Sequence, residues 1–239
     1  MSLKYILFIV EGNNDKRELD AILHSSYFVQ YKDKYKPVIY VTNGDITASA
    51  KVQEKNVVNK INEILIYFRR KGVPYSNISV SDIQEVVQIV DLDGAFIPYE
   101  NIVCGEDNTF IYEDDAIITS NVDGAYGRNR KKAEILERLI ETKEVGGVPY
   151  SVYYVSCNMD HVLFNERMPS QGNKNDSSFK FQCMCQENED ILKETMFNDE
   201  IIANCSYIES WNIVKEDCES LHRHTNLNLF FSDEAKNVK

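Results

Sequence analysis

Two acidic turns have the residue types and the spacing of a divalent-metal site. Each follows an apolar run of strand length: Glu11, Gly12 and Asp15 come after residues 4–10, and Asp91 and Asp93 after residues 85–90. Carboxylate oxygens are the ligands that Mg²⁺ prefers, and crowded carboxylates repel one another unless a cation lies between them. Such an ion keeps waters that a phosphate can replace, and it activates water for attack on phosphorus. The pattern predicts an Mg²⁺ or Mn²⁺ site with four ligands: Glu11, Asp15, Asp91 and Asp93.

These side chains can meet only if the runs before them are strands of one sheet. Residues 4–10 are apolar on both faces, which is typical of a buried parallel strand. Further strands are expected at 37–42, 85–90 and 151–156, alternating with helices at 15–23, 48–70 and 128–143. This alternation predicts an α/β fold with a mainly parallel central sheet and helices on both faces. In such a sheet, ligands bind outside the carboxyl ends of the strands.

The chain divides into two expected parts. Residues 1–165 form the α/β domain, and residues 166–239 form a loop and a helical C-terminal extension packed on it. Residues 166–180 are polar and contain Pro, Gly, Asn and Ser, so we expect a mobile loop there. Residues 187–235 are expected to form two or three helices, and residues 99–126 show no clear periodicity.

The two acidic turns together resemble the Toprim (topoisomerase–primase) domain, the catalytic module shared by topoisomerases, primases, small RNA maturases and OLD-family nucleases. In that family an apolar strand ends in Glu-Gly with an acid three residues after the Gly, and a later strand ends in Asp-x-Asp. The matching stretches here are residues 8–15 (FIVEGNND) and 89–94 (IVDLDG). The resemblance covers roughly residues 4–165 and implies a Toprim-like fold.

The resemblance also implies roles for the acids. Glu11 would be the general acid/base or a shared metal ligand, Asp91 and Asp93 the main Mg²⁺ ligands, and Asp15 a supporting one. The chain has no primase, gyrase or topoisomerase domains, so it is most similar to small stand-alone OLD-like and RloB-like Toprim nucleases. The RloB-like proteins carry Asn-Pro-x-x-Glu after a later strand. The stretch 154–161 here has Asn without the Pro, and Asp160 is the candidate for that acid.

A dense basic stretch follows the acidic turns in the sequence. Arg128, Arg130, Lys131 and Lys132 lie at the start of the expected helix 128–143. Basic charge in a first helical turn is unfavourable because it opposes the macrodipole. Its presence there therefore favours a functional role, such as binding nucleic-acid phosphates. The alternative is a solvated helix face, and in both cases Lys131 and Lys132 are expected to be exposed.

Histidines form the second group of candidates. His161 follows Asp160 and is interpreted first as a partly buried, hydrogen-bonded side chain, with a role in the site as the alternative. His222 and His224 flank Arg223. On a helix this pair points in different directions and is a poor zinc pair, whereas on a strand or loop it could bind phosphate or protonate a leaving oxygen.

Composition limits the classes of function. The formal net charge of −12 argues against a large nucleic-acid footprint but is compatible with an enzyme that meets a phosphodiester through metal and a local basic patch. The six cysteines lack zinc-knuckle spacing, so we expect reduced, structural thiols. The apolar runs are too short for a signal peptide or a membrane span, so we expect a cytoplasmic protein with no membrane partner.

Three functions are compatible with these patterns. The first is a Mg²⁺- or Mn²⁺-dependent nuclease of Toprim type acting on DNA or RNA, which the family associates with defence or toxin-like effectors. The second is a non-catalytic Toprim-fold module that binds or regulates a protein partner. The third, a receiver-type phosphoacceptor, expects a Lys after the last strand, and residues 156–158 (SCN) lack it.

Overall fold

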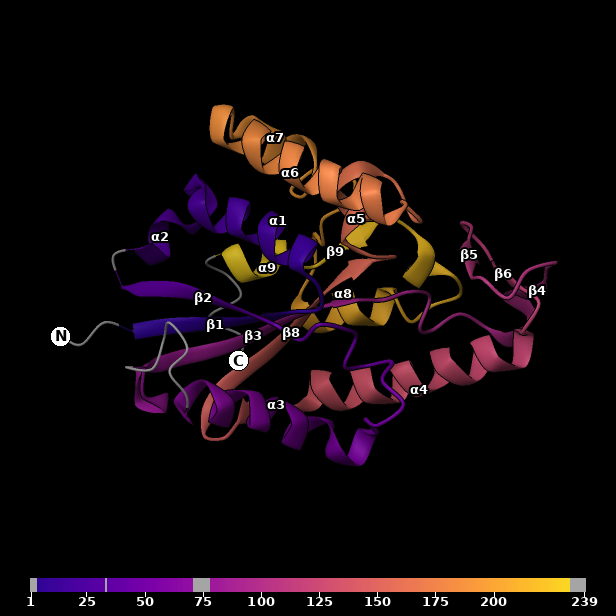
Figure 1. The fold of residues 1–239 in the computed structure, drawn as a ribbon, viewed down its shortest axis with the longest axis horizontal. Helices are drawn as coiled ribbons and strands as arrows, with labels where there is room; N and C mark the ends of the chain where they lie inside the picture. Colours follow the sequence, from indigo (N-terminus) through magenta and orange to yellow (C-terminus); the bar gives the residue numbers. More distant parts are fainter. Residues whose placement is uncertain (1–3, 33, 71–77, 233–239) are drawn as a thin grey trace.

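A mixed, mostly parallel sheet forms the centre of the molecule. The computed structural model describes residues 4–32, 34–70 and 78–232. Within these ranges the sheet has six strands in the order β2-β1-β3-β8-β7, with β9 also paired to β8. Four strands are parallel: β1 (Lys4–Val10), β2 (Tyr35–Val41), β3 (Ile83–Asp91) and β8 (Val148–Ser156). The short strands β7 (Glu144–Val145) and β9 (His224–Thr225) run antiparallel to β8. The predicted α/β class is confirmed (Figure 1).

The pairing of β1 with β3 is the part of the topology that positions the acidic turns. The two strands are parallel neighbours, with Phe8 opposite Val87 and Ile9 opposite Gln88. Alternate side chains of β1 enter the cores on opposite faces of the sheet: Ile6, Phe8 and Val10 on one, Leu7 and Ile9 on the other. The apolar residues on both faces explain why β1 is a buried, inner strand, as predicted.

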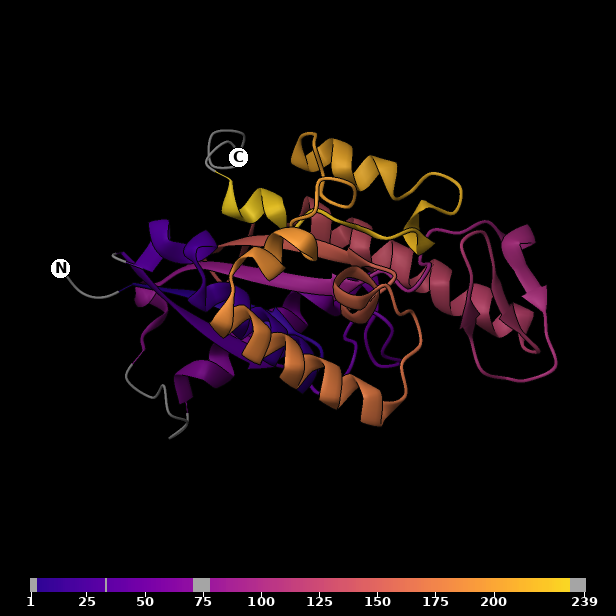
Figure 2. The ribbon, with the colours of Figure 1, turned by 90° about the horizontal axis from the view of Figure 1, so that it is seen from above.

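Helices cover both faces of the sheet, as Figures 1 and 2 show. One face packs against α1 (Asn13–His24), α5 (Met159–Phe164), α6 (Gln171–Glu187), α7 (Asp190–Glu194) and α9 (Asn228–Phe231). The other face packs against α3 (Glu54–Arg70), α4 (Val122–Glu141) and α8 (Tyr207–Ile213). The connections include the short helix α2 (Val29–Lys32) and the 3-10 turns η1 (Ser26–Phe28), η2 (Val80–Asp82), η3 (Tyr99–Asn101) and η4 (Glu219–Leu221).

A small three-stranded sheet lies beyond the carboxyl ends of the central strands (Figure 1). It consists of β4 (Ile102–Cys104), β5 (Ile111–Tyr112) and β6 (Ile117–Thr119), and we call residues 97–121 the lobe. Ile102 and Ile117 of the lobe pack with Leu221 in an apolar cluster separate from the two main cores. The stretch without clear periodicity is therefore a sheet whose strands of two or three residues are too short to show a pattern.

The prediction of a mobile loop at residues 166–180 is wrong for most of that range. Helix α6 begins at Gln171, with the Ser170 hydroxyl accepting a hydrogen bond from the Asn173 amide at 3.2 Å. Ser178 and Phe181 are buried, and the helix packs against α1. The sequence of α6 shows no clear apolar periodicity, because a surface helix of this kind buries few apolar side chains.

The C-terminal segment contributes strand β9 to the central sheet. Strand β9 pairs with the end of β8, and the Thr225 hydroxyl donates to the Tyr154 carbonyl at 2.8 Å. The Asn226 side chain accepts from the Tyr154 amide at 2.8 Å. Among the helices in the described ranges, none is long and apolar enough to cross a bilayer.

Candidate functional site

Glu11 and Asp91 lie side by side at the carboxyl edge of the sheet. Asp91 is the last residue of β3, and Glu11 follows the neighbouring strand β1 directly. Burial raises the pKa of Glu11 well above its usual range, and the charge of Asp91 raises it further. Burial likewise raises the pKa of Asp91, with Asp15 and Asp93 adding to the effect. The Lys132 ammonium opposes both of these shifts.

One oxygen of Glu11 has no hydrogen-bond partner. Its Oε1 atom is inaccessible to solvent and meets no donor among the described residues. A buried carboxylate oxygen without a donor is costly, because it has lost its water and gained nothing in exchange. A bound cation beside Asp91 is one partner that this oxygen could take.

Asp93, in contrast, is already held by two cations. Its Oδ2 atom accepts hydrogen bonds from the Arg128 Nη2 atom at 2.9 Å and from the Lys132 Nζ atom at 2.8 Å. The backbone at Asp93 is left-handed, with φ of 48°, and its amide donates to the Cys157 carbonyl at 2.8 Å. The following Gly94 also has positive φ, 68°, and an added Cβ atom there would clash with Leu221. This tight turn explains why a glycine follows the second aspartate.

Lys132 is the most buried charge in the site. Its side chain is 0% exposed, and its Nζ atom lies 2.8 Å from both Asp45 Oδ2 and Asp93 Oδ2. Burial alone would lower the pKa of an ammonium, but these two carboxylates, together with Glu11, raise the pKa of Lys132 above its usual value. Lys132 therefore remains charged and neutralises part of the acidic site.

Asp45 also belongs to the site, through its ion pair with Lys132. Burial would raise the pKa of Asp45, but Lys132 brings it below the usual range, and Thr47 adds hydrogen bonds. The Asp45 Oδ1 atom accepts from the Thr47 amide at 2.6 Å. Helix α3 starts only at Glu54, so Asp45 does not cap it. No local sequence pattern predicts this role, because Asp45 and Lys132 are 87 residues apart in the sequence.

The basic stretch does not form the expected exposed phosphate patch. Lys132 is buried and Arg128 is 25% exposed, and both point at Asp93. Lys131 donates to the Ser49 carbonyl at 2.6 Å. Arg130 alone of the four is largely exposed, at 68%, and lies 3.6 Å from Glu134.

The position of α4 on the sheet explains this correction. The helix begins at Val122, six residues before Arg128, and Asn121 caps it through a bond from the Gly124 amide at 3.1 Å. The basic residues therefore do not lie in a first turn, and the macrodipole argument does not apply to them. Helical spacing puts a set of residues on the buried face of α4: Ala125, Asn129, Lys132, Leu136 and Leu139.

Asp15 has a local structural role in addition to its acidic surroundings. Its Oδ2 atom accepts a hydrogen bond from the Gly12 amide at 2.7 Å and so closes the first turn of α1. Burial still raises the pKa of Asp15, although the Gly12 amide opposes this. The Glu-Gly-x-x-Asp spacing thus has a helix-capping cause, and the metal-binding role of Asp15 stays a prediction.

A second group of acids extends from Asp15 toward α6. Glu18 lies one helical turn after Asp15 and is 1% exposed, and the Ser178 hydroxyl lies near its carboxylate without making a regular hydrogen bond. Burial raises the pKa of Glu18 well above its usual range, and Asp15 and Asp160 raise it further. Asp160 is buried on α5, and its Oδ2 atom lies 3.2 Å from the Nζ atom of Lys174. Sequence analysis missed Glu18 and Lys174, although the i, i+3 spacing of Asp15 and Glu18 puts both on one helix face.

His161 is a buried, hydrogen-bonded histidine, as the first interpretation predicted. It is 1% exposed, and its Nδ1 atom accepts from the Cys157 amide at 2.9 Å. Burial, assisted by the charges of Arg167 and Arg223, lowers the pKa of His161 to about 4. The imidazole is therefore neutral near pH 7 and supports the turn between β8 and α5. His222 and His224 lie on a separate segment, at and just before β9.

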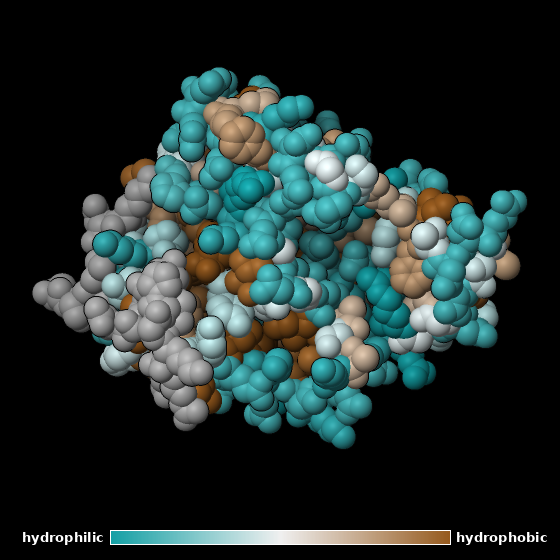
Figure 3. All heavy atoms as spheres, viewed as in Figure 1, coloured by the Kyte–Doolittle hydropathy of each residue, from teal (hydrophilic) through white to brown (hydrophobic). Residues whose placement is uncertain are grey.

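Hydrophilic side chains gather where the lobe meets the body of the molecule, at the right of Figure 3. Arg128 bridges the two parts, because its guanidinium lies 5.2 Å from the centre of the Phe110 ring and donates to the Tyr112 hydroxyl at 3.3 Å. The site therefore combines two acids with raised pKa values, Glu11 and Asp91, with a third acid, Asp93, that two cations hold. Comparisons of the chain with models of protein families, with characterised proteins and with solved structures find no match.

Proposed function

We propose that the chain is a Mg²⁺- or Mn²⁺-dependent phosphodiester-cleaving enzyme of Toprim type that acts on nucleic acid. The observation that carries the proposal is the pair Glu11 and Asp91 on adjacent parallel strands, with the Glu11 Oε1 atom buried and without a partner. Position, burial and raised pKa values together are what active-site carboxylates have more often than structural ones.

The donor set fits a hard divalent ion. Glu11 and Asp91 offer carboxylate oxygens, and burial raises both pKa values, that of Glu11 further through the charge of Asp91. A divalent ion between them would restore both charges. Asp93 is a weaker candidate ligand than the sequence suggested, because Arg128 and Lys132 share its Oδ2 atom.

Each residue of the site has a distinct task under this proposal. The ion, when bound, stabilises charge on phosphorus and activates a water. Glu11 lies where strand β1 meets its turn, so its second oxygen can orient that water and accept its proton. Arg128 is partly exposed at the edge of the site and can donate to a substrate phosphate. Lys132 holds Asp93 and Asp45 in place.

The test is cleavage of single- and double-stranded DNA and RNA with either metal, in the wild type and in Glu11→Gln. General acid/base catalysis contributes about 10²–10⁴-fold, so the variant should lose at least that much rate. Glu54→Gln, an exposed carboxyl-to-amide change on α3, is the matched control and should cleave as the wild type does. Cleavage that persists undiminished in Glu11→Gln contradicts the proposal.

One observation favours the second candidate function, a non-catalytic binding or regulatory module of the same fold. Lys132 already neutralises two carboxylates from within the protein, which reduces the need for a metal. This candidate predicts a wild type that is inert on every substrate of the panel and whose melting temperature does not respond to Mg²⁺ or Mn²⁺. The nuclease proposal predicts a rise in melting temperature by mass action.

A further inference from the structure

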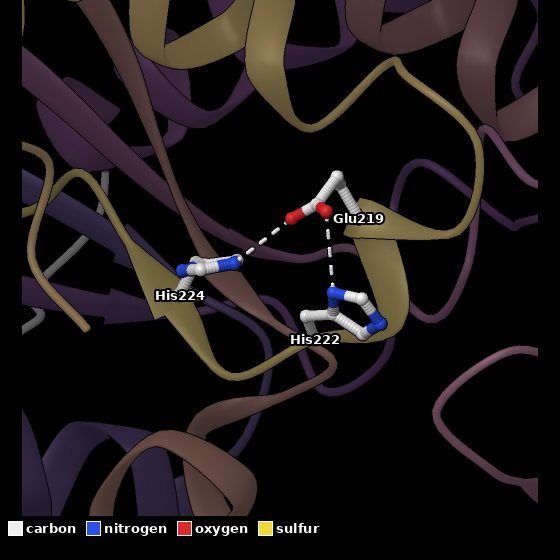
Figure 4. Close-up of side chains that lie close together, drawn as sticks. All are labelled: Glu219, His222 and His224. Atoms are coloured by element: carbon white, nitrogen blue, oxygen red, sulfur yellow. Dashed lines mark hydrogen bonds and ion pairs between the residues drawn. The ribbon is translucent and has the colours of Figure 1, made fainter. Parts of the chain in front are cut away.

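Three potential metal ligands meet on the segment that joins η4 to β9. Figure 4 shows Glu219 between two imidazole rings, with one carboxylate oxygen toward each. The Glu219 Oε1 atom lies 3.3 Å from His222 Nδ1, and the Oε2 atom lies 3.0 Å from His224 Nε2. One ligand atom from each of the three residues lies within 4.8 Å of the other two. This segment has no part in the proposed catalytic chemistry.

The backbone places both histidines on the same side. The chain is extended at His222, with ψ of 155°, and enters β9 at His224, so alternate side chains share a direction. Arg223 points the other way, and its guanidinium donates twice to the Val162 carbonyl, at 3.0 and 2.6 Å. The helical arrangement that would separate an i, i+2 pair is therefore absent at these residues, and the pair is held by an anchored strand.

The spacing suits a tetrahedral ion. Zinc–nitrogen bonds of about 2.0–2.1 Å put the ligand atoms of a tetrahedral site about 3.3 Å apart. The two contacts of Glu219 have nearly this length. Two neutral imidazoles and one carboxylate are the donor set that Zn²⁺ accepts readily and Mg²⁺ does not. All three side chains are about one-third exposed, so an ion and a completing water have access.

A second carboxylate lies behind His222. The Asp115 Oδ1 atom, on the lobe, is 3.7 Å from the His222 Nε2 atom, the nitrogen that faces away from Glu219. Metal-bound histidines commonly direct their other N–H group at a carboxylate, which fixes the ring and increases its basicity. Asp115 is placed to act in this way if His222 binds through Nδ1.

We propose that Glu219, His222 and His224 bind Zn²⁺ in a site distinct from the acidic site at Glu11 and Asp91. The ion would tie η4 to β9 and, through Asp115, to the lobe. Leu221 lies inside the tied segment and packs against Gly94, the residue after Asp93. Zinc at this position would therefore stabilise the turn that carries Asp93.

The experiment is titration of purified, metal-free protein with Co²⁺, a spectroscopic substitute for Zn²⁺, in millimolar Mg²⁺ that occupies carboxylate sites. The wild type should bind one equivalent with the intense visible absorption of tetrahedral cobalt, and one equivalent of Zn²⁺ should abolish that absorption. His222→Ala, His224→Ala and Glu219→Gln should each lose the absorption. Asp115→Asn should keep it with affinity lower by about 10–100-fold.

Two controls make the result specific. His24→Ala removes an exposed histidine from α1 and should bind as the wild type does. Asp91→Asn disables the proposed catalytic site and should also retain the absorption, so failure of one site is distinguishable from failure of the other. Melting of the metal-free variants should match that of the metal-free wild type. Absorption that survives in all three ligand variants, or a wild type without it, overturns the proposal.

Discussion

The substitution Lys132→Met is the strongest test of whether a buried ammonium stabilises the acidic site. The side chain is 0% exposed, and its ammonium lies 2.8 Å from both Asp45 and Asp93. Methionine has a similar volume but leaves two carboxylates without this charge. Breaking a buried ion pair by removing one partner costs about 3–5 kcal/mol, because the remaining charge stays buried and uncompensated. For a chain of this size each kcal/mol moves the melting temperature by about 2–4 °C.

Lys132→Met should therefore melt roughly 6–20 °C below the wild type in metal-free buffer. The matched control is Arg130→Met on the same helix, which is 68% exposed and lies 3.6 Å from Glu134. Loss of a surface pair of this kind costs about 0–1 kcal/mol. Adding Asp93→Asn to Lys132→Met should recover part of the loss, because it removes one of the unpaired charges.

Magnesium provides the second half of the test. An added divalent ion can replace part of the missing charge, so Mg²⁺ should raise the melting temperature of Lys132→Met more than that of the wild type. The assay is thermal unfolding with and without Mg²⁺. A Lys132→Met protein that melts within 2 °C of Arg130→Met would refute the reasoning, because the buried ammonium would then not hold the acids together.

Three further predictions concern Glu18, His161 and Arg128. Burial raises the pKa of Glu18 in the folded state. The free energy of unfolding is therefore highest below the ordinary carboxyl pKa, where Glu18 is protonated, and it falls as the pH rises toward the folded-state pKa. The free energy of unfolding of Glu18→Gln, measured with urea, should therefore increase relative to that of the wild type as the pH rises from about 5 to about 8. An equal difference between the two proteins at both pH values would contradict this. Burial lowers the pKa of His161 to about 4, so the stability it confers is present above its ordinary value of 6.5 and is lost as the pH falls between the two. His161→Asn should flatten the acid side of the stability profile, whereas a slope like that of the wild type would argue against a neutral, buried ring. Arg128→Gln should weaken nucleic-acid binding and reduce its salt slope by about one, and an unchanged slope would remove Arg128 from the interface.

The sheet was predictable from the sequence because its strands have strong and simple patterns. The run before Glu11 is apolar on both faces, and alternation with helices leaves few arrangements other than a parallel sheet. The adjacency of Glu11 and Asp91 then follows from topology, since both residues come at carboxyl ends of neighbouring strands.

The fine structure of the site was less accessible, because it depends on long-range pairs. Nothing near Lys132 in the sequence identifies Asp45, 87 residues away, as the partner of its ammonium. The helical spacing on α4 does indicate that Lys132 points inward, since it falls in register with Leu136 and Leu139 on the buried face. A basic residue in register with core positions is therefore better interpreted as a buried partner than as a surface charge.

Helix α6 and strand β9 were missed for different physical reasons. Helix α6 is polar on most of its surface and buries only Ser178, Phe181 and Cys185. Strand β9 has two residues, so no alternation is visible, and its place is set by Thr225 and Asn226 bonding to Tyr154. Elements of this kind are specified by tertiary contacts rather than by local periodicity.

The central claim is that Glu11 and Asp91 hold one divalent ion between them. The most direct measurement is an anomalous difference map from crystals soaked in Mn²⁺, with Asp91→Asn crystals treated in the same way. We predict one anomalous peak within bonding distance of the Glu11 Oε1 atom and an Asp91 oxygen, and its loss in the variant. Absence of a peak at this position in wild-type crystals, or a peak that remains in Asp91→Asn, would contradict the account.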